Sequence, residues 1–102
     1  MSPLNEDYAD ITEFLVDAYE MSHQHPETFD IPSNEQWSNA RTGDFAIISD
    51  NFERFWTKID HLHEEKIYAT VDSPTGGEEN GYGFSQKVVF QRRHAYVIMD
   101  QQ

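Results

Sequence analysis

Three short apolar runs within residues 43–72 constrain the fold of this chain more than any other feature. They read DFAIIS, FERFWTKI and KIYATV, and turn-forming residues separate them. Each run is rich in β-branched and aromatic residues, the composition that suits a pleated, half-buried surface. The three runs therefore predict consecutive strands of a meander.

Two further strands are predicted after this meander. Val88 and Phe90 indicate a fourth strand, residues 91–94 a single helical turn, and residues 95–99 a fifth strand. The glycine-rich residues 72–83 are predicted to form a long mobile loop. Five short strands with a turn before the last predict a mostly β (α+β) fold built on a small, strongly bent, SH3-like five-stranded barrel.

The alternation of side chains along each strand predicts which of them face the barrel interior. The predicted interior set is Phe45, Ile47, Phe55, Ile59, Ile67, Val71, Val88, Phe90 and Val97. A second apolar set would then point outward, namely Ile48, Trp56, Tyr68, Val89 and Ile98. Because a patch of this size seldom stays exposed on a soluble monomer, another segment is expected to cover it.

The expected cover is an N-terminal amphipathic helix over residues 8–23. Its apolar residues recur at three- and four-residue spacing, and they are Ile11, Phe14, Leu15, Ala18 and Met21. Pro26 is expected to end this helix, and residues 33–36 fit a capping box that begins a short helical turn. We predict one domain over residues 1–102, with the helix and a connector in 1–42, the barrel in 43–102, and the helix docked on Trp56.

The charge of the chain excludes several classes of partner. Nineteen acidic residues against seven lysines and arginines give a formal net charge of −12. Nucleic acids and anionic membranes would be repelled, whereas a basic partner would be attracted. The chain has no cysteine, so disulfides and thiolate metal sites are not expected. No apolar run approaches the roughly 20 residues that span a bilayer, and no signal-peptide pattern is present, so we expect a soluble, cytoplasmic protein.

Several short motifs stand in an order that resembles the YegJ-like family, a domain of unknown function (number 2314). In chain order they are HPETF at 25–29, IPS at 31–33, GD at 43–44, ERFW at 53–56 with Lys58, VD at 71–72, and VVF at 88–90 followed by His94. The resemblance covers about residues 25–98. The sequence departs from the family pattern at residues 46–48, where a lysine is frequent, and at residues 72–74, where Asn-Asp-Pro is replaced by Asp-Ser-Pro. The resemblance implies a fold and no reaction.

The sequence contains none of the frames that mark a catalytic site. A nucleophile elbow, a phosphate-binding glycine loop and an HExxH motif are all missing from it. Two histidine pairs have the spacing of metal ligands, His23 with His25 and His61 with His63. Nothing in the sequence unites the two pairs, so we predict solvated histidines and no metal site. We therefore predict a protein that is not an enzyme and that holds no cofactor.

Arg54, Trp56 and Lys58 share one face of the second predicted strand and form a candidate ligand-binding site. Two cations beside a tryptophan can make a ligand platform through cation–π contacts. The structural alternative is that the aliphatic stems of Arg54 and Lys58 flank a buried Trp56 under the helix. Both interpretations place the three side chains together.

Charge is distributed unevenly along the chain. Residues 1–40 hold nine acids and no lysine or arginine. The candidate partner-binding residues on the predicted helix are Glu6, Asp10, Glu13, Asp17 and Glu20. Their acidity either serves solubility or forms an acidic face for a basic protein partner, with charge that mimics a nucleic acid. The one basic cluster, Lys87 with Arg92 and Arg93, is interpreted as internal charge balance in preference to an anion site.

These patterns predict a small acidic binding module that acts by protein–protein contact. Its predicted partner is a protein with a basic surface, and it binds neither nucleic acid nor membrane directly. The predicted setting is a phage or mobile-element protein that inhibits a host factor. The alternative is a small-ligand or nucleotide sensor that uses Arg54, Trp56 and Lys58 together with the 72–83 loop. No sequence feature indicates an oligomeric state.

Overall fold

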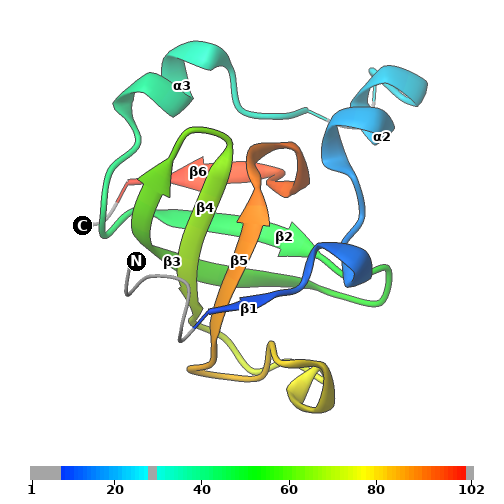
Figure 1. Ribbon diagram of the computed structural model, residues 1–102. Coiled ribbons are helices and arrows are strands. Elements are labelled where there is room, and N and C mark those ends of the chain that lie inside the picture. The colour runs from blue at the N-terminus through cyan, green and yellow to red at the C-terminus, as the bar shows by residue number, and fades with distance from the viewer. Residues whose placement is uncertain (1–7, 28–29, 101–102) are drawn as a thin grey trace.

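The computed structural model describes residues 8–27 and 30–100, whose strands form one mixed sheet (Figure 1). The strands are β1 (Ala9–Asp10), β2 (Phe45–Ser49), β3 (Arg54–His63), β4 (Lys66–Val71), β5 (Lys87–Gln91) and β6 (Val97–Met99). Their order across the sheet is β1-β5-β4-β3-β2-β6, with β1 parallel to β5 and all other neighbours antiparallel. The mostly β fold is as predicted. The described residues form six strands where five were expected, and the sheet is not closed into a barrel.

Short helices lie at both ends of this sheet. The α-helices are α2 (Ala18–Gln24) and α3 (Asn34–Asn39), and the 3-10 turns are η1 (Thr12–Phe14), η2 (Glu78–Asn80) and η3 (Arg92–His94). α2 and α3 lie at one end, and η2 lies at the opposite end (Figure 1). The predicted capping box is present at α3, where Ser33 and Gln36 each bond to the other's backbone N–H. Among the described residues, no helix is long and apolar enough to cross a membrane.

The predicted helix over residues 8–23 is wrong in its first half. Residues 9–10 form β1, which pairs with Val88 and Val89 of β5. The Asp10 carboxylate accepts hydrogen bonds from the Thr12 N–H at 3.0 Å and from the Thr12 hydroxyl at 2.8 Å. A short polar side chain that bonds to nearby backbone favours a turn over a helix. Pairing with β5 and this local turn therefore override the helical spacing of the apolar residues.

Only the second half of that segment is α-helical, and it does not cover Trp56. Asp17 is the N-cap of α2, where its side chain accepts a hydrogen bond from the Glu20 N–H at 3.0 Å. α2 ends at Gln24, just before Pro26, as predicted. It packs beside η3, at the end of the sheet, and Trp56 stays exposed. The docking of the helix on Trp56 was therefore a wrong prediction.

The two faces of β2 are the reverse of those predicted. Ala46 and Ile48 are fully buried, whereas Phe45 and Ile47, assigned to the interior, are half-buried. The reason is the register with β3, in which Ala46 lies opposite Thr57 and Ile48 opposite Phe55. A shift of one residue in register moves every side chain of a strand to the other face.

The two faces of β6, which pairs with β2, are also the reverse of those predicted. Ile98 lies opposite Ala46 and packs against the core, whereas Val97, predicted to be interior, lies opposite Ile47 and is exposed. The second strand was predicted correctly, because Phe55, Thr57 and Ile59 are buried, whereas Arg54, Trp56 and Lys58 are exposed. It runs on to His63, beyond the end of the predicted apolar run at Ile59, with an irregularity between Ile59 and His61.

One hydrophobic core joins the sheet to the segments before it. Its buried members are Ile11, Trp37, Ala46, Ile48, Phe55, Ile59, Ile67, Ala69, Val71, Tyr82, Val88, Phe90 and Ala95. Phe14 and Leu15, from the predicted helical stripe, also pack against this core, from η1 and the residue after it. Trp37 brings α3 onto the core in the same way. η1 and α3 therefore belong to the same packed unit as the sheet.

Residues 72–86, the segment between β4 and β5 that contains the predicted 72–83 loop, make hydrogen bonds among themselves and with Glu53 and Asp50. The Thr75 hydroxyl donates to the Tyr82 carbonyl at 2.7 Å, and the Gly76 N–H donates to Glu53 Oε2 at 2.8 Å. Tyr82 is buried in the core, and its hydroxyl donates to Asp50 Oδ2 at 2.8 Å. A buried aromatic with a satisfied hydroxyl anchors this segment although it is rich in glycine.

His94 is expected to make the stability of the fold dependent on pH. Its buried Nδ1 accepts a hydrogen bond from the Gln91 N–H at 3.1 Å, and burial lowers the pKa of His94, which the charge of Asp17 only partly offsets. Below the unfolded pKa of about 6.5, the unfolded chain binds a proton that the folded chain resists. Stability is therefore expected to fall as the pH decreases from about 7.5 through 6.5 towards the lower folded pKa, in urea titrations.

The variant His94→Gln is expected to flatten this pH dependence, because glutamine keeps an acceptor for the Gln91 N–H and does not titrate. His63→Gln is the matched control, since His63 is exposed at the end of β3. If both variants keep the same slope as the parent protein, His94 does not cause it.

Candidate functional site

Apolar side chains of three neighbouring strands stand together on the outer face of the sheet. Ile47 of β2 lies between Trp56 of β3 and Val97 of β6, and Phe45 of β2 lies opposite Met99 of β6. Trp56, Val97 and Met99 are 38%, 38% and 44% exposed, and Phe45 and Ile47 are half-buried. We call these five residues the apolar sheet face.

The two cations predicted to accompany Trp56 lie at the margin of the apolar sheet face. Lys58 lies opposite Phe45, and both Lys58 and Arg54 are exposed. The Arg54 guanidinium lies over the ring of Tyr96, 4.4 Å from its centroid. Trp56 itself meets the Phe45 ring edge-on at 5.9 Å. The structure thus brings Arg54, Trp56 and Lys58 to one face, although the cation of Arg54 is stacked on Tyr96.

Backbone hydrogen bonds hold Trp56 in position. Its N–H donates to the Ser73 hydroxyl at 2.9 Å, and its carbonyl accepts from the Asp72 N–H at 2.8 Å. β4 ends at Val71, opposite Thr57, so residues 72–73 continue beside β3 where the ladder stops. The exposed ring therefore stands on a fixed strand, and a rigid aromatic of this kind loses little conformational entropy when it binds.

The five acids predicted to form a partner-binding face do not share a helix. Glu6 lies outside the described residues. Asp10 is held in its turn with Thr12, whose N–H and hydroxyl lower the pKa of the Asp10 carboxyl. Asp17 caps α2 and also pairs with Arg93, at 2.6 Å between Oδ2 and Nε.

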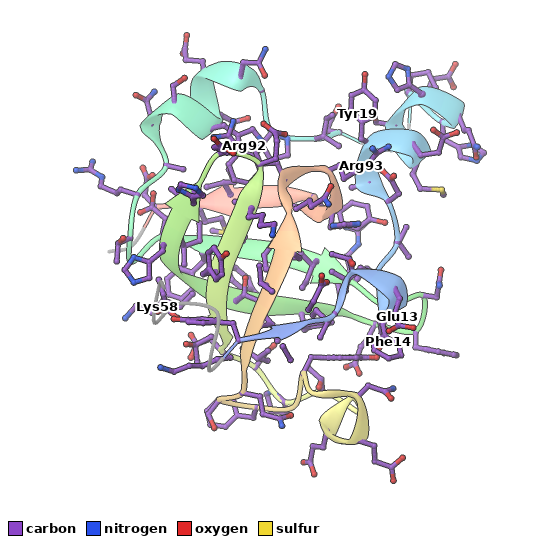
Figure 2. All side chains as sticks on the ribbon, viewed as in Figure 1. Glu13, Phe14, Tyr19, Lys58, Arg92 and Arg93 are labelled. Carbon is purple, nitrogen blue, oxygen red and sulfur yellow. The ribbon has the colours of Figure 1, made fainter. Side chains whose placement is uncertain are left out.

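Among the acids of this set that the structure describes, Glu13 and Glu20 are exposed and lie outside the β1 turn. Glu13 stands on η1, at the opposite side of the view from Lys58 (Figure 2). Glu20 stands on α2 and accepts a hydrogen bond from the Gln24 side chain at 3.1 Å. A common acidic face on one continuous helix was therefore a wrong expectation, although both carboxylates remain available for long-range attraction.

The histidine pairs are not brought together with other ligands. His61 and His63 are exposed on β3, and His23 packs edge-on against the Tyr19 ring at 4.5 Å. In the part of the chain that the structure describes, no group of three or more His, Asp or Glu side chains could hold a metal ion.

Comparisons of this chain with protein-family models, curated proteins and solved structures found no match. The resemblance to the YegJ-like family therefore stays a prediction. What the fold and the site define is a small, mostly β domain with an exposed apolar sheet face on fixed strands. That face and the charge of the chain are the two features that bear on its function.

Proposed function

We propose that this chain is a non-enzymatic binding module that docks a protein partner on the apolar sheet face. The observation that carries the proposal is the exposure of Trp56 on β3 and of Val97 and Met99 on β6, on one face and on either side of β2. Contiguous exposed apolar groups on a soluble domain mark interaction sites. Aromatic residues and methionine are enriched at the centres of protein interfaces, and tryptophan is among the commonest hot spots.

The net charge of −12 specifies the chemistry of this partner. A second copy of the chain and a nucleic acid would both be repelled, whereas a protein of net positive charge would be attracted over long distance. Glu13 and Glu20 contribute to this attraction in our proposal, and the apolar sheet face makes the contact. Arg54 and Lys58 then lie in the polar rim, where carboxylates of the partner can meet them.

An inhibitor of a host factor, encoded by a phage or mobile element, remains the proposed setting. The alternative of a small-ligand sensor at Arg54, Trp56 and Lys58 has less support. Sites for small ligands are concave and enclose most of the ligand. Here the Arg54 guanidinium is stacked on Tyr96, and Trp56 stands on an exposed strand.

We also infer that the sheet is related to SH3-like barrels. Two observations support this inference. β2 to β5 form an antiparallel meander, and after the η3 turn β6 returns to pair with β2. This connection brings the last strand beside the first strand of the meander, as the closure of a small barrel requires.

Trp56→Ala is expected to weaken binding of the partner roughly 30-fold, because truncation of a central aromatic costs about 2 kcal/mol and 1.4 kcal/mol is tenfold. The partner is first identified by a photo-crosslinking amino acid placed at Met99 in the source cells, with the same group at the exposed Glu35 of α3 as a control. Binding of the purified partner is then measured by calorimetry.

Phe52→Ala is the matched control for this measurement. Phe52 is 92% exposed in the turn between β2 and β3, away from the apolar sheet face. Its truncation should leave the affinity unchanged. Equal crosslinking at positions 99 and 35, or unaltered affinity of both Trp56→Ala and Val97→Asp, would show that the partner does not dock there.

A further inference from the structure

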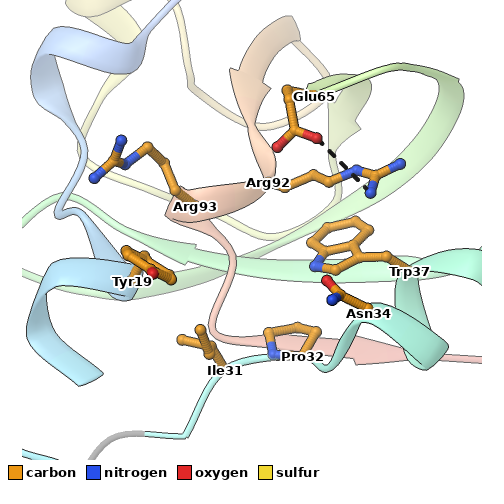
Figure 3. A pocket seen from close by; sticks show the side chains of 8 residues that line it. All are labelled: Tyr19, Ile31, Pro32, Asn34, Trp37, Glu65, Arg92 and Arg93. Atoms are coloured by element: carbon orange, nitrogen blue, oxygen red, sulfur yellow. Dashed lines mark ion pairs between the residues drawn. The ribbon is translucent and has the colours of Figure 1, made fainter. Parts of the chain in front are cut away.

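A pocket of about 190 Å³ lies between α2, α3 and η3, on residues that the proposed docking face does not use. Its walls include Tyr19, Ile31, Pro32, Trp37, Arg92 and Arg93 (Figure 3). Two arginines and two aromatic rings therefore meet apolar groups at one hollow. The chain has seven lysines and arginines against nineteen acids, so two arginines at one pocket are an unusual local concentration of positive charge.

Arg93 is already neutralised at this pocket. Its Nε lies 2.6 Å from Asp17 Oδ2, and its guanidinium lies over the Tyr19 ring, 5.7 Å from the centroid. An arginine with a close carboxylate and a ring beneath it is satisfied within the protein. The charge balance expected from the sequence therefore holds for Arg93, which fixes Tyr19 as one wall of the pocket.

Arg92 is not satisfied in this way. Its guanidinium lies 5.3 Å from the centroid of the Trp37 ring, and its buried Nε has no hydrogen-bond partner among the described residues. Its Nη1 is 3.9 Å from Glu65 Oε2, and the Glu65 side chain is 76% exposed. An ion pair at this distance, with the carboxylate side exposed, is weak and exchanges readily. Buried donors of native proteins almost always have an acceptor, so the Arg92 Nε–H indicates a missing one.

We propose that this pocket binds a small carboxylic acid with an aromatic or aliphatic body. The carboxylate would bind the Arg92 guanidinium, whose planar donors match a carboxylate in a two-bond arrangement. The body would lie against Trp37, Pro32 and Ile31. The ligand displaces Glu65 from Arg92, so the carboxylates compete. The volume is below that of usual ligand sites, which restricts the body to about one ring or a short chain.

Sodium benzoate is the probe, and chemical shifts of backbone amides in the ¹⁵N-labelled full chain are the readout. We expect saturable shifts, in the millimolar range for so small a ligand, at residues 31–37 and 91–94. Benzamide tests the charge because it has the same ring and is neutral. Inorganic phosphate tests the contribution of the apolar body, because it is an anion that has no aromatic or aliphatic part. Equal shifts from benzamide or from phosphate would overturn the proposal, and so would the absence of saturable shifts with benzoate.

Two variants test the role of Arg92. Arg92→Gln should weaken benzoate binding at least tenfold, while Arg41→Gln, the same charge change at an exposed residue outside the pocket, should not. Glu65→Gln removes the competing carboxylate and should strengthen binding, an effect that a purely structural role of Arg92 would not produce. If Arg92→Gln fails to fold, Glu65→Gln decides alone: unchanged or weaker benzoate binding by that variant overturns the proposal.

Discussion

Replacement of Tyr82 by alanine is expected to lower the free energy of unfolding by roughly 3–5 kcal/mol, the range for truncation of a buried aromatic. Tyr82 is buried, and its ring is stacked on Phe55, with centroids 5.3 Å apart and an interplanar angle of 9°. Phe14 packs on it from η1 at 5.8 Å. The ring thus joins the 72–86 segment, the sheet and the N-terminal segment, and its loss leaves a cavity among all three.

Tyr82→Phe separates the hydroxyl from the ring. The hydroxyl donates to Asp50, whose carboxylate also accepts from the N–H groups of Phe52 and Glu53 at 3.0 Å each. Burial alone would raise the pKa of Asp50, but these three hydrogen bonds together lower it, so a carboxylate is present. Hydrogen bonds to charged groups are worth about 1.5–3 kcal/mol, and Tyr82→Phe should lose an amount in that range.

Urea unfolding at neutral pH measures both losses. Phe84→Ala is the control, since Phe84 belongs to the same segment and is exposed, and its effect should stay within about 0.5 kcal/mol. A Tyr82→Ala variant no less stable than Phe84→Ala would mean that the 72–86 segment is not anchored by this ring.

Local signals in the sequence predicted the parts of the fold that depend on local interactions. The capping box at Ser33 formed because its hydrogen bonds join residues three apart. The alternation of β3 held because period two is a property of one strand, which is why Trp56 was placed correctly on an outer face. The η3 turn also lies where residues 91–94 predicted it.

The parts of the fold that were not predicted depend on pairing between segments that are distant in the sequence. The buried face of β2 depends on its register with β3, and that of β6 on its register with β2. The prediction was one residue out of register, so it placed Ile47 and Val97 in the interior instead of Ile48 and Ile98. The apolar sheet face could therefore not be assembled in advance, although its Trp56 was identified. β1 exists because β5 offers it an edge, and nothing within residues 9–10 signals a strand.

The pocket at Arg92 shows the same division between local and distant information. The pair Arg92 and Arg93 was visible as a basic cluster, and charge balance describes Arg93 correctly. The difference between the two arginines arises from their partners, Asp17 for one and Trp37 with Glu65 for the other. Those partners lie more than 25 residues away along the chain, so only the fold distinguishes a neutralised cation from an unsatisfied one.

Gly77→Ala is expected to destabilise the protein by about 1–3 kcal/mol, the usual cost of forcing extra volume into a packed site. A Cβ built on Gly77 would overlap the Tyr82 ring. Backbone strain is not the cause, because Gly77 has a φ of −99°, which alanine adopts without penalty. The glycine is needed so that the backbone of the 72–86 segment can approach the buried ring.

The neighbouring glycine supplies a matched control for that argument. A Cβ on Gly76 would meet nothing closer than Glu53 Oε2, at 3.7 Å, which is ordinary contact. Gly76→Ala should therefore be neutral, or more stable by about 0.4–1 kcal/mol, because alanine restricts the unfolded chain. If the two adjacent substitutions change the free energy of unfolding equally in urea, then contact with Tyr82 does not explain the effect of Gly77→Ala. Flexibility of the segment would explain both effects instead.

A double-mutant cycle ties the loss at Gly77 to the Tyr82 ring. In a Tyr82→Ala background the overlapping atoms are gone, so Gly77→Ala should cost less than about 0.5 kcal/mol. Sites that share no contact give additive losses, so additivity here would contradict the overlap. Strong coupling would instead show that the Tyr82 ring is the reason why Gly77, and not Gly76, must be a glycine. Contacts with Phe55 and Asp50 hold that ring in place.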